Sequence, residues 1–155
     1  MKIVFLISCL IISLFASAQT PTVTFKNPAT VAKPTGYSHA AEIDLGKSKM
    51  LLISGQVALD AEGNVVGESD FAKQTDQIFT NIKNIIENSG GTLNDLVKIT
   101  IYLRDVSNIT KFREIRNKYI NVENPPASTL VEITDLARDE FLVEVEATAV
   151  IPKVK

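Results

Sequence analysis

The sequence predicts one α+β domain in which two helices lie on one face of a mixed β-sheet. Segments of alternating apolar and polar residues, typical of half-buried strands, are separated by two segments with apolar residues at helical spacing. The expected order is strands, helix, strand, helix, strands, and no internal repeat, linker or low-complexity tract interrupts it. Elements in this order form a single layered domain around one core.

Before this domain, the chain has the pattern of a secretory signal peptide. Lys2 precedes an apolar run over residues 3–14, and Ala16-Ser17-Ala18 has the small residues of a cleavage site. The run is shorter than the about 20 apolar residues that a membrane-spanning helix needs. We therefore expect residues 1–18 to be removed and the protein to be exported, either to the periplasm or out of the cell, without membrane attachment afterwards. A retained N-terminal anchor is the alternative.

The rest of the chain divides into an arm and a domain. Residues 19–35, rich in Pro and Thr, are expected to form an extended N-terminal arm with a short edge strand at Val23–Phe25, and residues 36–155 form the domain. Lys2 and Cys9 leave with the signal peptide, so 15 basic and 18 acidic side chains remain, a net charge of −3. Without cysteine there is no disulfide or thiolate metal site. The negative charge counts against binding to nucleic acid, which depends on Lys and Arg contacts with phosphates.

Two strands should begin the domain. The first is expected at Tyr37–Leu45, and the second at Met50–Leu59, in which residues 50–53 are all apolar, as in a strand buried on both faces. Glu62-Gly63-Asn64 is a turn.

The longer helix should begin at Ser69 or Asp70 and end at Gly90-Gly91, where glycine provides a left-handed cap. Its expected apolar stripe consists of Phe71, Ile78, Ile82, Ile85 and Ile86. Its expected polar face consists of Gln74, Asp76, Lys83 and Asn84.

The second half of the domain should also contain a strand followed by a helix. A strand is expected at residues 96–104, with Val97, Ile99, Ile101 and Leu103 on its core face. A helix follows from Ser107 or Asn108, and its apolar stripe is Ile109, Phe112, Ile115 and Tyr119. Asn124-Pro125-Pro126 should break it. Two final strands are expected at about Thr129–Thr134 and Phe141–Ile151.

Paired carboxylates on the last strand are the first candidate site. Glu144 and Glu146 are two residues apart, so their side chains share one face while Val143 and Val145 point to the core. Such a pair can orient a water molecule or divide acid and base roles. The alternative is an ordinary solvated sheet face.

Ser54-Gly55-Gln56 is the second candidate. Glycine permits close approach of a ligand to the backbone, and Ser and Gln supply donors and acceptors. The alternative is an ordinary bulge or turn. His39, the only histidine, is read as a surface or interface residue. Because the chain has no Walker loop, dinucleotide glycine pattern or metal-ligand cluster, no metal or cofactor is expected.

Arginines are candidate anion clamps, because guanidinium binds a carboxylate through two parallel hydrogen bonds. The candidates are Arg104, Arg113, Arg116 and Arg138, and for each the alternative is a surface charge.

Taken together and in order, several short segments resemble the RidA/YjgF family of reactive imine and enamine deaminases. The resemblance covers Gly36 to Val150 and is carried by Tyr37, Asp44-Leu45-Gly46, Ile53-Ser54-Gly55-Gln56, Gln74-Thr75, Asn81-Ile82, Gly90, Val97–Leu103 with Asp105, Phe112, Tyr119 and Pro126-Ala127.

This resemblance implies a chorismate-mutase-like fold and a homotrimer with ligand clefts between neighbouring subunits. In active members, an arginine after Pro-Ala holds the substrate carboxylate. A water near a glutamate of the last strand attacks the imine carbon, and ammonia and a 2-oxo acid leave. Carried over to this chain, the catalytic glutamate is Glu144. The substrate-binding residues include Tyr37, Ser54, Gly55 and Gln56.

The chain departs from the family at the arginine. Ser128 stands there, and a hydroxyl offers one neutral hydrogen bond without charge. Arg116, at a position where the family often has asparagine, is the candidate replacement. Two functions stay open: a RidA-like deaminase of altered specificity that hydrolyses 2-imino or enamino acids, and a non-catalytic RidA-like protein that binds a small ligand, such as a carboxylate. The net charge counts against an RNA-cleaving role, which is sometimes attached to the family.

Overall fold

The computed structural model describes residues 22–153, so the predicted signal peptide lies outside the described residues. All strands within this range join one sheet in the order β1-β2-β3-β6-β4-β5. Their bounds are β1 Val23–Lys26, β2 Ala40–Asp44, β3 Ser48–Gln56, β4 Leu96–Leu103, β5 Ala127–Glu132 and β6 Val143–Pro152. Neighbouring strands are antiparallel except β4 and β5, which are parallel. The sheet is therefore mixed, as the sequence predicts.

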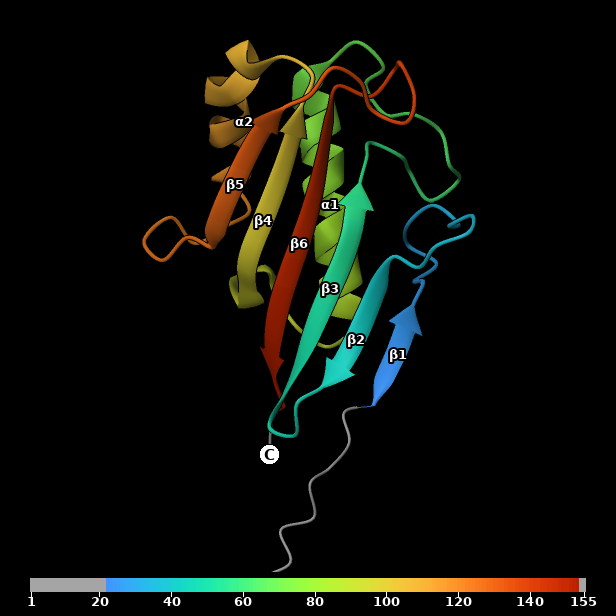
Figure 1. The fold of residues 1–155 in the computed structure, drawn as a ribbon, viewed down its shortest axis with the longest axis vertical. Helices are drawn as coiled ribbons and strands as arrows, with labels where there is room; N and C mark the ends of the chain where they lie inside the picture. The colour runs from blue at the N-terminus through green and yellow to red at the C-terminus, as the bar shows by residue number, and fades with distance from the viewer. Residues whose placement is uncertain (1–21, 154–155) are drawn as a thin grey trace, which may run out of the picture.

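Two α-helices cover one face of this sheet and leave the other face open (Figure 1). They are α1 (Phe71–Asn88) and α2 (Ile109–Arg116), and the short 3₁₀ turns η1 (Leu93–Asp95) and η2 (Val106–Asn108) lie at the ends of β4. The predicted α+β architecture, with helices on one face only, is confirmed. No helix within residues 22–153 is long and apolar enough to cross a membrane.

The core fills the space between α1 and the sheet. The predicted stripe of α1 faces inward, and Phe79 adds an aromatic ring that lies 6.0 Å from the ring of Phe112 of α2. The fully buried side chains that meet it from the sheet are Leu51, Ile99, Ile101, Leu103, Val143, Val145 and Ala149. Because all of them point to the helical side of their strands, the side chains between them point to the open face.

The ends of α1 follow the expected signals. Asp70 caps the first turn, where its carboxylate accepts a hydrogen bond from the backbone N–H of Lys73 at 3.1 Å. After the C-cap Ser89, Gly90 takes a positive φ of 79°, the left-handed conformation that favours glycine.

The prediction for Gln74 was wrong, because this side chain lies in the core and not on the polar face of α1. Its amide donates to the backbone carbonyls of Gly67 and Glu140, at 3.0 and 2.7 Å, and accepts from the N–H of Leu142 at 2.9 Å. The side chain is fully buried because it satisfies the backbone of two loops.

Two strand residues also differ from expectation. Val97 is exposed and Leu96 is buried, because a register shift between Leu96 and Lys98 in the pairing with β6 reverses the alternation there. Leu52, expected to be buried on a strand covered on both sides, is 44% exposed, because nothing in residues 22–153 covers the open face.

Element ends were the least predictable feature. The first predicted strand, Tyr37–Leu45, starts only at Ala40, and the second ends at Gln56, after which Leu59 forms an isolated bridge with Val65. The second helix ends at Arg116, well before the prolines. Its last turn continues as hydrogen-bonded turns up to Ile120, whose N–H donates to the carbonyl of Arg116 at 3.2 Å.

Candidate functional site

The end of β3 and the beginning of β6 meet in an irregular stretch of the sheet. The pairing of the two strands shifts register between Ile53 and Gln56, which leaves Ser54 and Gly55 outside the regular ladder. Glu144 of β6 uses the space above Gly55. A Cβ at position 55 would lie 1.8 Å from Oε1 of Glu144, so no side chain fits there while the carboxylate keeps its place.

Glu144 lies in surroundings that disfavour its charge. Burial raises the pKa of Glu144, and the negative charge of Glu146 raises it further. Glu146 is exposed on the same open face, where its Oε2 accepts a hydrogen bond from the hydroxyl of Tyr102 on β4 at 3.2 Å. A raised pKa makes the Glu144 carboxylate a stronger base, which suits the role of a general base.

Hydroxyl groups approach the same place from the segment before β2. Tyr37 is half exposed, and burial followed by the charge of Glu144 raises the pKa of its phenol, which places the two groups near each other. Ser54 donates its hydroxyl to the carbonyl of Ser38 at 2.7 Å, and its N–H donates to the carbonyl of His39 at 2.9 Å. These bonds fix the loop of Tyr37 to the end of β3.

His39 corrects the expectation of a surface or interface residue, because its side chain is buried. One ring nitrogen, Nε2, lies 2.7 Å from the carbonyl oxygen of Ala32, and Nδ1 lies 3.2 Å from Nε2 of Gln56. The same Gln56 amide donates to the carbonyl of Ser54 at 2.9 Å. Gln56, expected to bind substrate, is thus buried beside the histidine, where its amide helps to hold the segment before β2 against the end of β3.

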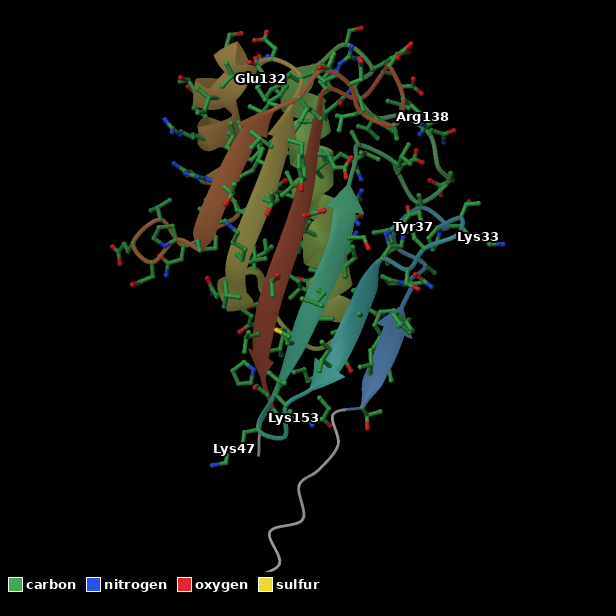
Figure 2. The ribbon with its side chains drawn as sticks, in the orientation of Figure 1. Lys33, Tyr37, Lys47, Glu132, Arg138 and Lys153 are labelled. Carbon is green, nitrogen blue, oxygen red and sulfur yellow. The ribbon has the colours of Figure 1, made fainter. Side chains whose placement is uncertain are left out.

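A wide groove of about 690 Å³ opens beside this cluster. Its lining residues are Phe25, Gly36, Tyr37, Ser38, Ala41, Leu52, Ile53 and Ser54. Figure 2 shows Tyr37 on the segment that precedes β2, near the β1–β2 edge of the sheet. The groove is therefore apolar along the strands and polar at the end that carries the hydroxyl groups.

Ser128 and Arg116 do not join this groove within one chain. Ser128 lies on the edge strand β5, in register with the buried Ile99, so it points to the helical side of the sheet, whereas Glu144 points to the open side. Arg116 ends α2, and its Nε and Nη2 donate to Oδ1 of Asn117 at 3.2 and 2.9 Å. The predicted site residues are therefore not brought together within one chain, because Glu144 lies on the central strand β6, Ser128 on the edge strand β5 and Arg116 at the end of α2.

The other candidate arginines bind elsewhere. Arg104 donates to the carbonyls of Asp139 and Phe141, and Arg138 lies over the ring of Phe141, 4.4 Å from its centroid. Both hold the loop before β6. Residues 22–153 contain no group of three metal-binding side chains placed to share an ion.

Comparison with known proteins agrees with this fold. The endoribonuclease L-PSP family matches residues 28–151, which is most of the chain. The chain belongs to this family, the RidA/YjgF family of the sequence resemblance. Of its RutC-type members, a protein of Pyrococcus abyssi is 36% identical over 118 residues, which cover 76% of this chain and 88% of the relative.

Solved structures of RidA-like proteins have the same fold. A crystal structure of a yeast protein superposes with a TM-score of 0.74 and 28% identity, over 85% of this chain and 100% of the yeast chain. RidA from an Antarctic Psychrobacter superposes with a TM-score of 0.70 and 32% identity, over 83% and 98% of the two chains. The RidA/YjgF fold therefore extends over nearly all of the described residues.

Sequence reasoning missed two residues of the site. Tyr102 was read only as part of a polar strand face, and its contact with Glu146 depends on the register of β4 against β6. Ser38 accepts the Ser54 hydrogen bond through its backbone, for which no side-chain pattern exists.

Proposed function

We propose that the groove beside Glu144 hydrolyses the C=N bond of a small imine, as in a RidA-like deaminase of altered specificity. The observation that carries this proposal is the position of the Glu144 carboxylate: it is partly buried, has a raised pKa, lies against the backbone of Gly55 and has the Tyr37 phenol nearby. Hydrolysis of an imine needs a base that activates water beside an open ligand space. Glu144 is the proposed base, and the proposed ligand space is the groove lined by Tyr37 and by Ser54, the neighbour of Gly55.

In the proposed reaction, Glu144 accepts a proton from a water molecule while the water oxygen bonds to the imine carbon. Glu144 gives this proton to the nitrogen, which leaves a carbinolamine. It then takes the proton of the new hydroxyl group and transfers it to the same nitrogen, so the C–N bond breaks as the C=O bond forms. Ammonia leaves and the carbon becomes a carbonyl, so one water is consumed and no oxidant or reductant is needed. Gly55 keeps the space for the carboxylate open.

The proposed site is completed by a homotrimer, as the family resemblance implies. The open face of the sheet supports this, because it presents Leu52, Val97 and Val131 to solvent in the single chain, each at least 40% exposed. Exposed apolar side chains on one face of a sheet are typical of an interface. Sedimentation of residues 19–155 should show a trimer, and Leu52→Lys should shift it to the monomer by placing an unpaired charge in the contact.

The test of catalysis is ammonia release from freshly generated 2-iminobutanoate. Residues 19–155 should release ammonia above the spontaneous rate, and Glu144→Gln should lose about 100-fold, the usual contribution of a positioned base. Unchanged activity in Glu144→Gln would remove the proposed role of the carboxylate.

A second candidate function is binding without turnover. It is favoured by Ser128, since the chain lacks the arginine that holds the substrate in active relatives of the sequence resemblance. Thermal stabilisation by 2-oxobutanoate without ammonia release from 2-iminobutanoate would favour this second function.

We also propose that the protein works outside the cytoplasm, on the basis of the pattern of residues 1–18. N-terminal sequencing of the protein recovered from the periplasm or the medium should begin at Gln19, whereas recovery from the cytoplasm with residues 1–18 attached would contradict the proposal.

A further inference from the structure

We propose that His39 and Gln56 form a pH-sensitive support for the segment that carries Tyr37. The support holds while the His39 ring is neutral, and it is released when the ring gains a second proton. His39 is a positioning residue, because its buried ring acts through its neighbours and not on a ligand. Only the effect on ligand binding rests on the proposed function, since the state of the ring can be measured without a ligand.

The partners of the His39 ring determine which nitrogen carries hydrogen. Nε2 lies 2.7 Å from the carbonyl oxygen of Ala32, which can only accept, so Nε2 carries the hydrogen and donates it. Nδ1 lies 3.2 Å from Nε2 of Gln56. An amide nitrogen only donates, so Nδ1 carries no hydrogen and accepts. The ring is therefore neutral in this arrangement, with both nitrogens bonded.

The orientation of the Gln56 amide is set independently of the histidine. Its Nε2 donates to the carbonyl of Ser54 at 2.9 Å and lies 3.4 Å from the carbonyl oxygen of Gly55. Reversing the amide would place its oxygen against these two carbonyl oxygens, with no hydrogen between the acceptors. Gln56 must therefore present an N–H to His39, and it cannot turn round to accept a second ring proton.

A second proton on the ring has no acceptor in this arrangement. The new N–H at Nδ1 would point at the N–H of Gln56, and a positive charge would form on a side chain that is 3% exposed. Within residues 22–153, no carboxylate forms an ion pair with His39. A buried charge without a partner is costly, so protonation should separate His39 from Gln56.

Most of the neighbouring charges are already engaged or face solvent. The titratable groups on the segments around the ring are Lys26, Lys33, Tyr37, Glu42, Asp60, Glu62, Lys83, Glu87 and Glu144. The lysines and glutamates of β1, β2 and α1 pair with one another, at 3.6 and 3.8 Å. Asp60 accepts hydrogen bonds from Asn64, and Lys33 and Glu62 are exposed.

Glu144 is the remaining acid near the support. It lies against Gly55, the neighbour of Gln56, and its charge acts on Tyr37. An ionised Glu144 would favour a positive charge on the ring. Burial raises the pKa of Glu144, however, so this carboxylate loses its charge at a higher pH than an ordinary glutamate does. It therefore cannot stabilise a charged His39 throughout the acid range.

The support is linked directly to the groove. The rings of Tyr37 and His39 meet edge to face, with their centroids 5.4 Å apart and an angle of 80° between their planes. The N–H of Ser54 donates to the carbonyl of His39 at 2.9 Å. Figure 2 shows Tyr37 on the segment that leads into β2, and both Tyr37 and Ser54 line the groove. Separation of His39 from Gln56 should therefore displace residues on two sides of the groove.

Acid should destabilise the fold through this support. A histidine in an unfolded chain takes up its second ring proton near about pH 6.5, whereas the folded arrangement resists it. The unfolded chain then binds more protons, so the folded state loses stability as the pH falls from 7 towards 5. Glu144 acts in the opposite direction, because its raised pKa favours the folded state as the pH falls. The two contributions are therefore distinguished by their sign.

Nuclear magnetic resonance of the ring nitrogens tests the inference on the natural sequence. His39 is the only histidine, so residues 19–155 prepared without a histidine tag give the signals of one ring. At pH 7.5, hydrogen should be found on Nε2 and not on Nδ1. On acidification, the ring should gain its proton over the same pH range in which the amide signals of Ser54 and Gly55 change. Hydrogen on Nδ1 at pH 7.5, or ring protonation that leaves both amides unchanged, would overturn the inference.

His39→Gln is the matched variant for thermal melts. Its amide keeps a donor for Ala32 and an acceptor for Gln56, but it does not titrate. Between pH 7 and pH 5, the Tm of the natural chain should fall by roughly 3–6 °C more than that of the variant. The same comparison in a Glu144→Gln background should retain this difference. Equal losses of Tm by the natural chain and His39→Gln would contradict the support, and the ring signals decide alone if the variant does not fold.

Ligand binding tests the consequence for the groove. 2-Oxobutanoate stays ionised from pH 7 to pH 5, so a change in its affinity comes from the protein. By calorimetry, the natural chain should lose about tenfold more affinity over this range than His39→Gln. Equal losses would show that the support does not act on the groove. If 2-oxobutanoate binds neither chain at any pH, the proposed ligand is wrong, while the ring signals and the melts still decide whether the support exists.

Discussion

The carboxylate of Glu144 fills the space that a side chain on residue 55 would need, with Oε1 only 1.8 Å from the position of a Cβ there. The two residues are far apart in sequence and are brought together by the pairing of β3 with β6. Gly55 is thus required by its neighbour on the next strand, and not by a turn, since its φ is not positive.

Gly55→Ala should therefore displace Glu144 and abolish function with little loss of stability. We expect at least a 100-fold loss of ammonia release and a change of about 1 kcal/mol or less in the free energy of unfolding, because the far end of the flexible Glu144 side chain can move aside. Urea denaturation and the activity assay measure the two effects. Gly63→Ala is the control: with a φ of 88° in a remote turn, it should cost about 1 kcal/mol of stability by strain and leave activity unchanged. Full activity in Gly55→Ala would show that the position of Glu144 is unimportant.

Glu144→Gln should stabilise the protein at neutral pH. The pKa of Glu144 is raised in the folded state, so the folded protein binds more protons than the unfolded chain, and the contribution of this group falls as the pH rises above about 4.3. Thermal melts of the variant and the natural chain should give similar Tm values near pH 4 and a higher Tm for the variant at pH 7. The same Tm difference at both pH values would mean that the pKa is not raised.

Glu146→Gln should shift the pH dependence of the proposed reaction. Removing the negative charge of Glu146 lowers the pKa of Glu144, so the ionised base becomes available at lower pH. The acid limb of the kcat/KM profile should therefore move to lower pH. Tyr102→Phe is the control: it removes the hydrogen bond to Glu146 but keeps the Glu146 charge, so the acid limb should move much less. An acid limb that stays in place would show that Glu146 does not act on the base.

Gln74→Leu should destabilise the fold by about 2–4 kcal/mol, because it leaves the carbonyl of Glu140 and the N–H of Leu142 buried without their side-chain partner. Lys73→Leu, the preceding exposed residue, should change stability by about 0.5 kcal/mol or less. Urea denaturation compares the two variants, and equal losses would mean that the Gln74 hydrogen bonds contribute little.

The sequence predicted the arrangement of the helices and the sheet better than the burial of individual side chains. Alternation along β6 placed Glu144 and Glu146 together and Val143 and Val145 in the core, because side-chain direction in a strand follows from spacing alone. Leu52 was expected to be buried because an apolar run does not tell whether a second layer covers the strand. The prediction for Val97 was wrong because the register shift between Leu96 and Lys98 changes the alternation at that one position, while Ile99, Ile101 and Leu103 are buried as predicted.

The positions of buried polar residues were harder to predict than those of apolar ones. His39 and Gln74 are buried because other segments supply their hydrogen-bond partners, Ala32 and Gln56 for His39 and the loop at Glu140 for Gln74, and no periodic pattern in the sequence records such partners. For the site, the sequence predicted Tyr37, Ser54, Gly55 and Glu144 through a resemblance, and the structure brings these four together. It could not predict that Gln56 is buried beside His39, that Ser128 points to the helical side of the sheet, or that Arg116 donates to Asn117 at the end of α2.

The position of β6 has a consequence for how the chain folds. It is the last strand of the domain to be synthesised, yet it lies in the middle of the sheet, between β3 and β4. Until it arrives, β1 to β3 and β4 with β5 are separate pieces with unpaired backbone edges, and a centre built from distant segments forms slowly. The sheet can therefore be completed only after β6 has been synthesised, and until then the edges of β3 and β4 that pair with it stay open to other chains.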